Sequence, residues 1–161
     1  AHATADFRDQ FYGLVGSVSD TADGPPLITS GLIGVGTHRW GERTVKFART
    51  HYSAPRVDMG RLSPSMQQWA ERRLVPKVLV ATQAKRLHAV ADHDGAWLPS
   101  VPVITVTPND PDDAGLLDRI EAALLHPRAT EWARATYVGA GLNPTAIKLS
   151  ARQLLQMPLF D

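Results

Sequence analysis

The 161-residue sequence contains no cysteine. Disulfide bonds, thiolate metal sites and a cysteine nucleophile are therefore excluded. Long apolar runs are also absent, because the longest stretches, such as 78–80 and 101–106, are far shorter than the roughly 20 residues that span a bilayer. The chain does not open with the charged and apolar regions of a signal peptide. These absences favour a cytoplasmic protein with no membrane partner.

Size and composition indicate one domain with a buried core. A hydrophobic content of 43% in 161 residues is sufficient for such a core. The sequence begins with Ala1 rather than methionine, and we expect it to be a piece of a longer protein.

Charge is unevenly distributed along the chain, although the formal net charge is only +1. Residues 39–86 contain eleven basic and three acidic residues, a balance of +8, whereas the rest of the chain contains six basic and thirteen acidic residues, a balance of −7. A basic segment of this kind can neutralise phosphates and release counterions from nucleic acid. It can equally be a solvated surface whose cations pair with acids elsewhere in the chain. Charge alone leaves both interpretations open.

Hydrophobic periodicity predicts an α+β fold with a β-rich recognition core, packed helices and a helical C-terminal third. Ser63 and Pro64 give the clearest helix start, because they combine a hydroxyl cap with proline in the first turn. Thr4 is expected to cap the first helix, and Asp94-Gly95 predicts a hairpin turn. Helices are expected over 3–15, 63–74, 116–124, 130–138 and 150–156, and strands over 43–48, 77–81, 86–91 and 101–107. Residues 27–33 are expected to form either one interrupted strand or two short ones.

Patterns that suggest cofactor binding or catalysis are incomplete. Gly34 and Gly36 begin a dinucleotide-type glycine pattern, but Arg39 stands where the third glycine belongs and no helix pattern follows. The stretch 88–94 contains two histidines and two aspartates, but such residues are frequent in turns and helical HExxH spacing is absent. No serine lies in a GxSxG motif. We therefore predict neither catalytic residues nor a metal site in this chain.

A polar connection between two expected strands carries the residues best suited to reading bases. It contains Thr82, Gln83, Lys85 and Arg86. Glutamine can bond an adenine edge through two hydrogen bonds, arginine and lysine favour guanine, and all four residue types can contact phosphate. An ordinary polar turn is the alternative interpretation.

The order of the segments resembles one known family. The run 76–80, a polar turn with Arg86, and the run 89–95 resemble the core of a target-recognition domain of N-6 adenine DNA methyltransferases of restriction–modification systems, which is related to type I specificity-subunit domains. Each piece alone is a weak hydrophobic pattern, and their order over nearly the whole chain carries the resemblance. The remaining pieces are an entry strand at 27–33, a strand at 103–107, a helix ending at 122–127, glycines at 139–141 and a closing run at 155–159.

The resemblance implies a linker helix at 1–16, following a catalytic domain, and a DNA target-recognition domain at 17–161. The sequence departs from the family at His126, where the family has asparagine. The catalytic (N/D)PP(Y/F) motif is also missing, because 109–111 and 143–145 lack the second proline and the aromatic residue. The chain itself is therefore expected to bind no cofactor, and S-adenosylmethionine is expected in a covalently linked methyltransferase domain upstream.

These observations lead to the hypothesis that the chain recognises duplex DNA in a sequence-specific manner, mainly through residues 39–86, and positions it for methylation by the separate domain. Two alternatives remain: a protein-interaction module built on the helices of the last third, and an RNA-substrate-binding domain of a modifying enzyme. The candidate DNA-binding residues are Lys46, Arg56, Lys77 and Lys148, which would contact phosphates, and Thr82, Gln83, Lys85 and Arg86, which would reach base edges.

Overall fold

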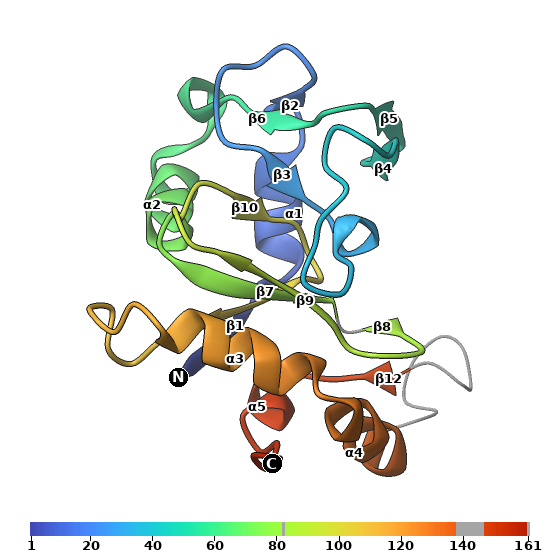
Figure 1. Ribbon diagram of the computed structural model, residues 1–161. Helices are drawn as coiled ribbons and strands as arrows, with labels where there is room; N and C mark the ends of the chain where they lie inside the picture. Colours follow the sequence, from blue (N-terminus) through green and yellow to red (C-terminus); the bar gives the residue numbers. More distant parts are fainter. Residues whose placement is uncertain (82, 138–146, 161) are drawn as a thin grey trace.

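The centre of the computed structural model is a four-stranded antiparallel sheet with the strand order β1-β11-β7-β9 (Figure 1). The structure describes residues 1–81, 83–137 and 147–160. Helices and sheets are mixed along the chain, which confirms the α+β class, and three of the five α-helices of the described residues follow residue 115. The strands of the central sheet are β1 (His2–Ala5), β7 (Lys77–Ala81), β9 (His88–Asp92) and β11 (Ile104–Thr107).

Both faces of this sheet are covered, and the sequence of β7 reflects it. All five residues of β7 are buried, and successive side chains of a strand point to opposite faces. Val78 and Val80 pack with the helices that lie below the sheet in Figure 1, whereas Leu79 and Ala81 pack with residues 28–45 on the other face. The lower helices are α3 (Leu116–Leu125), α4 (Pro127–Tyr137) and α5 (Ala151–Leu154).

The upper layer holds two helices, several short strand pairs and a second apolar cluster around Trp69. In α2 (Pro64–Arg73), the Ser63 hydroxyl accepts a hydrogen bond from the backbone amide of Met66 at 3.2 Å, so the predicted helix start is confirmed. The other elements are α1 (Arg8–Leu14), β2 (Val18–Ser19) with β6 (Arg56–Val57), β3 (Leu27–Ile28) with β10 (Leu98–Pro99), β4 (Val45–Phe47) with β5 (Thr50–Tyr52), and 3-10 turns at Ser30–Leu32 and Met59–Arg61.

The N-terminal segment differs from the prediction. The helix expected over 3–15 begins only at Arg8, and residues 2–5 form β1 instead. Thr4 lies opposite Thr105 in the sheet, so it caps no helix. A strand at this place completes the backbone hydrogen bonding of β11, which is a non-local partner that helical spacing along the sequence cannot reveal.

Residues 1–16 are also integrated into the fold rather than separate from it. Asp6 is buried and accepts hydrogen bonds from Trp69 Nε1 at 3.0 Å and from Arg73 Nη2 at 2.7 Å. Leu14 is fully buried in the upper cluster. The boundary expected at residue 16 therefore does not separate two units in this structure.

The turn at Asp94-Gly95 is present, but it does not connect two paired strands. The next strand, β10, pairs with β3, and β11 after it pairs with β7 rather than with β9. Gly95 has a φ of +64°, and a Cβ there would lie 2.6 Å from the carbonyl carbon of Val75. Glycine is required by this close approach as well as by the left-handed backbone.

Candidate nucleic-acid interface

The pairing of β8 (Gln83–Ala84) with β12 (Ile147–Lys148) brings together two distant parts of the sequence. The strands are antiparallel, with Lys148 opposite Gln83. Ile147 and Leu149 are buried, whereas Lys148 between them is exposed. The alternation of a strand therefore anchors β12 through its neighbours and directs the ammonium group of Lys148 to the surface.

Helix α4 holds the segment that carries Lys85 and Arg86. The backbone oxygen of Lys85 accepts a hydrogen bond from Arg134 Nε at 2.8 Å, and the backbone amide of Leu87 donates to Thr130 Oγ1 at 3.1 Å. Leu87 is buried, whereas Lys85 and Arg86 are exposed. Both predicted cations therefore stand on a fixed backbone and face solvent. Arg134 is an exposed cation of this group that no sequence pattern singled out.

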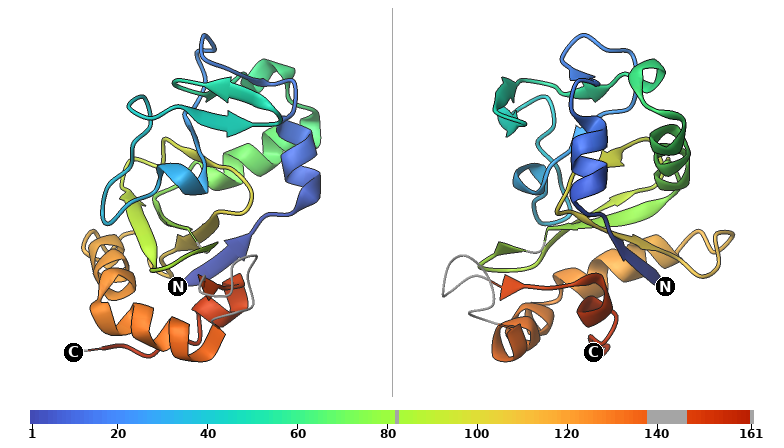
Figure 2. Two further views of the ribbon diagram at one scale, coloured as in Figure 1. Left: turned by 90° about the vertical axis from the view of Figure 1, so that its right-hand side faces the viewer. Right: turned by 180° about the vertical axis from the view of Figure 1, so that it is seen from behind.

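A second group of cations lies on the β4–β5 hairpin. Val45 and Phe47 are buried and Lys46 is exposed, so the predicted alternation of this strand is confirmed. Arg43 and Arg49 are exposed on the same segment. The hairpin and the β8–β12 pair both lie on the right-hand side of Figure 1 and on the left-hand side when the molecule is seen from behind in Figure 2.

Arg56 is half-buried and makes contacts within the protein. Its Nη1 donates a hydrogen bond to the backbone oxygen of Gly24 at 2.9 Å, and its guanidinium carbon lies 4.8 Å from the ring centre of Trp40. The indole nitrogen of Trp40 in turn donates to the Pro55 oxygen at 2.8 Å. These contacts hold the β6 segment in place. They also occupy part of the Arg56 guanidinium group, which was predicted to contact phosphate.

Lys77 contradicts its predicted role. Its side chain is fully buried, and Nζ donates to Asp92 Oδ2 at 2.6 Å and to the Val75 oxygen at 3.3 Å. Burial lowers the pKa of Lys77, and the hydrogen bond and charge of Asp92 oppose this shift. Asp92 also accepts from the backbone amides of Ala96 and Trp97. Lys77 therefore stabilises the turn after β9 and has no access to phosphate.

Two predicted residues have little or no structural description. Thr82 lies outside the described residues, and for Gln83 the structure describes the backbone pairing alone. Their proposed contacts to base edges stay predictions.

Part of the basic segment is neutralised within the protein. Its ion pairs include Arg61 with Asp58 at 3.4 Å, Arg73 with Asp6 at 2.7 Å and Lys77 with Asp92 at 2.6 Å. These three cations are therefore paired within the protein, but only Arg61 is a surface charge, because Lys77 is fully buried and Arg73 is largely buried. Within the described residues, Lys46, Arg49, Lys85, Arg86 and Lys148 have no acidic partner within 4.0 Å.

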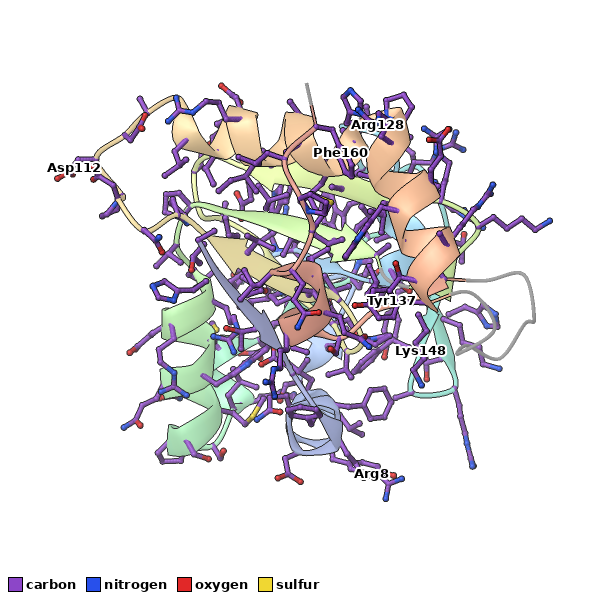
Figure 3. The ribbon with its side chains drawn as sticks, turned by 90° about the horizontal axis from the view of Figure 1, so that it is seen from below. Arg8, Asp112, Arg128, Tyr137, Lys148 and Phe160 are labelled. Atoms are coloured by element: carbon purple, nitrogen blue, oxygen red, sulfur yellow. The ribbon has the colours of Figure 1, made fainter. Side chains whose placement is uncertain are left out.

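The acidic loop 109–113 lies away from these cations. Figure 3 shows Asp112 and Lys148 on opposite sides of the molecule. Within the loop, Asp113 pairs with Arg119 at 2.5 Å, and this contact lowers the pKa of Asp113. The acidic loop and the exposed Lys148 are therefore separated in the folded protein as well as in the sequence.

The stretch suggested for metal binding is used otherwise. No group of three metal-ligating side chains occurs in the part of the chain that the structure describes. Asp92 is occupied by Lys77, and His93 Nε2 lies 2.7 Å from Asp118 Oδ1. The glycine pattern is also structural, because Gly34 and Gly36 exchange backbone hydrogen bonds with Ala89.

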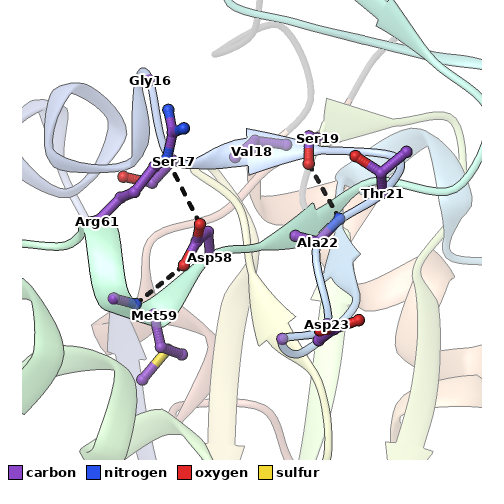
Figure 4. A pocket seen from close by; sticks show the side chains of 12 residues that line it. Gly16, Ser17, Val18, Ser19, Thr21, Ala22, Asp23, Asp58, Met59 and Arg61 are labelled. Atoms are coloured by element: carbon purple, nitrogen blue, oxygen red, sulfur yellow. Dashed lines mark hydrogen bonds and ion pairs between the residues drawn. The ribbon is translucent and has the colours of Figure 1, made fainter.

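A cavity of about 640 Å³ in the upper layer offers no catalytic arrangement (Figure 4). Its walls are the segments 16–24 and 58–61. Asp58 accepts from the backbone amide of Gly60 at 3.0 Å and lies 3.4 Å from Arg61, while Ser19 accepts from the Ala22 amide at 3.0 Å. These polar groups serve the local turns, and the described lining lacks an acid–base or nucleophile–base pair.

Comparison of the sequence with protein-family models and with curated proteins found no match in either set. Among the described residues, no helix has both the length and the apolar character that crossing a bilayer requires.

Proposed function

We propose that this chain is the sequence-specific DNA-recognition domain of an adenine-specific DNA methyltransferase, and that it positions duplex DNA for methylation by a separate, covalently linked catalytic domain. In this proposal the chain performs no chemical step. The target adenine is rotated out of the duplex into the catalytic domain, which holds S-adenosylmethionine. The segment order described above supports the methyltransferase part of the proposal.

The single observation that carries the DNA part is the β8–β12 pairing. It brings the exposed Lys148 next to the segment with Lys85 and Arg86, although these residues are far apart in the sequence. The group has no acidic partner among the described residues. Duplex DNA carries about one negative charge per 1.7 Å of its axis, so closely spaced free cations gain affinity by releasing counterions.

The contacts would divide by side-chain type. Lys46, Lys85 and Lys148 present flexible ammonium groups, which suit phosphates and set the register of the domain on the duplex. Arg86 and Gln83 have planar groups that can form paired hydrogen bonds with base edges. Because α4 fixes the backbone at Lys85 and Leu87, the intervening Arg86 would be presented from a rigid support.

A binding titration with a matched control tests the proposal. The Lys85→Ala/Lys148→Ala double variant removes two cations of the group, and Arg72→Ala removes an exposed cation of α2. We expect the double variant to bind a mixed-sequence duplex more weakly and to lower the steepness of the salt dependence by about 2, with Arg72→Ala unchanged. Equal losses in both variants, or binding by structured RNA in preference to duplex DNA, would contradict the proposal.

One observation favours the protein-interaction alternative. An apolar groove of about 360 Å³ runs between α3, α5 and the chain end, and Leu155 and Leu159 on its rim are exposed. Sedimentation with and without duplex DNA separates the two functions. Self-association that DNA does not alter would favour the interaction module, whereas a DNA complex of a single chain would favour recognition.

A further inference from the structure

The tip of the β4–β5 hairpin has a backbone conformation that its residues disfavour. Phe47 pairs with Thr50, so Ala48 and Arg49 form a two-residue connection. Their φ angles are 49° and 68°, which is the left-handed region at both positions. A turn of this kind is normally occupied by Asn-Gly or a similar pair, because a Cβ raises the energy of left-handed backbone.

The hairpin is held in this conformation by its inner face. Val45 and Phe47 are buried, and the Phe47 ring centre lies 5.1 Å from that of Phe11. The Trp40 indole, stacked against Arg56, anchors the neighbouring strand through the oxygen of Pro55. Packing therefore maintains a strained tip, and strained backbone that persists in this way is often found at functional sites.

The outer face and the tip are basic. Lys46 and His51 are exposed and lie directly opposite each other across the two strands. Residues 43–52 contain Arg43, Lys46, Arg49 and His51 and no acid. Arg49 is exposed in the two-residue connection itself. The hairpin is thus a narrow ribbon with an arginine at its tip and basic groups on its outer side.

We propose that this ribbon enters the major groove of DNA and that Arg49 donates two hydrogen bonds to O6 and N7 of a guanine. The major groove, about 12 Å wide, admits a two-stranded ribbon, and arginine is the usual partner of guanine there. Lys46 and His51 contact phosphates at the wall of the groove. The inference rests on the proposed function and adds to it the groove, the base and the residue that reads it.

Selection of duplexes from a pool with a randomised centre, using the 161-residue chain, provides the ligand for the test. We expect the selected sites to share a guanine whose replacement by 7-deazaguanine, which lacks N7, weakens binding about tenfold. Arg49→Lys keeps the charge but replaces the planar pair of donors by a single ammonium group, so its guanine discrimination should be weaker than that of the unaltered chain while binding of unrelated duplex stays within about twofold. Arg72→Lys on α2 is the matched control and should behave as the unaltered chain.

The Arg49→Gly variant tests whether misfolding, instead of the missing guanidinium group, causes a loss of guanine preference. Glycine relieves the left-handed strain at φ 68°, so its melting temperature should equal or exceed that of the unaltered chain while the guanine preference is lost. If the unaltered chain binds duplex DNA but 7-deazaguanine and Arg49→Lys have no effect, the inference is wrong and the proposed function stands. If the unaltered chain binds no duplex DNA, the proposed function fails and the inference fails with it.

Discussion

Two lysines on short strands, Lys77 in β7 and Lys148 in β12, lie in opposite environments. Lys77 is fully buried and faces Asp92 across the central sheet, at 2.6 Å. Lys148 is exposed and faces Gln83 across the peripheral β8–β12 pair. Both follow or precede apolar residues, so the local sequence does not distinguish them. The residue opposite each lysine and the layers that cover its strand decide whether the cation stabilises the fold or remains available to a partner.

Removal of the buried acid should have the largest effect. Asp92→Ala leaves the Lys77 ammonium group without its charged partner and removes the acceptor of the Ala96 and Trp97 amides. We expect a loss of about 3–5 kcal/mol in the free energy of unfolding, measured by urea denaturation. Asp94→Ala, an exposed neighbour, is the control and should change little. A loss under 1 kcal/mol in Asp92→Ala would mean that the buried Lys77–Asp92 pair contributes little to stability, so that Lys77 would not differ from Lys148 in this respect.

A second buried acid should have an intermediate effect. Asp6→Ala removes the acceptor shared by Trp69 and Arg73, and we expect a loss of about 2–3 kcal/mol by the same measurement. Asp6→Asn keeps an oxygen for the Trp69 indole and should lose less. No loss in Asp6→Asn would show that the charge pairing with Arg73 contributes nothing, whereas equal losses in the two variants would show that this pairing accounts for the whole effect.

Lys148 should affect binding instead of folding. Lys148→Ala is expected to leave the free energy of unfolding within about 0.5 kcal/mol, because the side chain is exposed. Its affinity for duplex DNA should fall at low salt, with a salt slope lower by about 1. Thermal unfolding and fluorescence anisotropy on the same sample check both parts. A destabilised Lys148→Ala variant would mean that Lys148, like Lys77, stabilises the fold.

The exposed pair in the acidic loop should have the smallest effect. Arg119 lowers the pKa of Asp113 in the folded state below its ordinary value of 3.8. The stabilisation from this pair is therefore present above pH 3.8 and is lost as the pH falls through the folded-state pKa. The difference in unfolding free energy between the unaltered chain and Asp113→Asn should be small at neutral pH and vanish in acid. A difference that grows on acidification would contradict this assignment.

Local signals in the sequence predicted some elements well. Ser63-Pro64 marks the start of α2 because cap and first turn are adjacent residues. The alternation at Val45, Lys46 and Phe47 predicted which side of β4 is exposed. These features depend on neighbouring residues, which a single sequence displays directly.

The failures have a non-local cause. Residues 2–5 form β1 instead of the predicted helix because they pair with the edge of β11, about a hundred residues away in the sequence. Burial of Lys77 depends on its register with Asp92, and the approach of Lys148 to β8 depends on a two-residue pairing. Such short pairings leave too few alternating positions for a sequence pattern to reveal them. The sequence therefore predicted individual residues of the candidate interface, but it did not show which of them lie together on the folded protein.

The salt dependence of DNA binding by the unaltered chain is the sharpest test of whether these exposed cations contact DNA. If Lys46, Lys85 and Lys148 contact phosphates, the logarithm of the association constant should fall with the logarithm of salt concentration with a slope of about −2.7, or about −0.9 for each contact. Fluorescence anisotropy of a labelled duplex gives this slope. We expect a slope near this value, whereas a slope near zero, or no binding at low salt, would show that these lysines do not hold the chain on DNA.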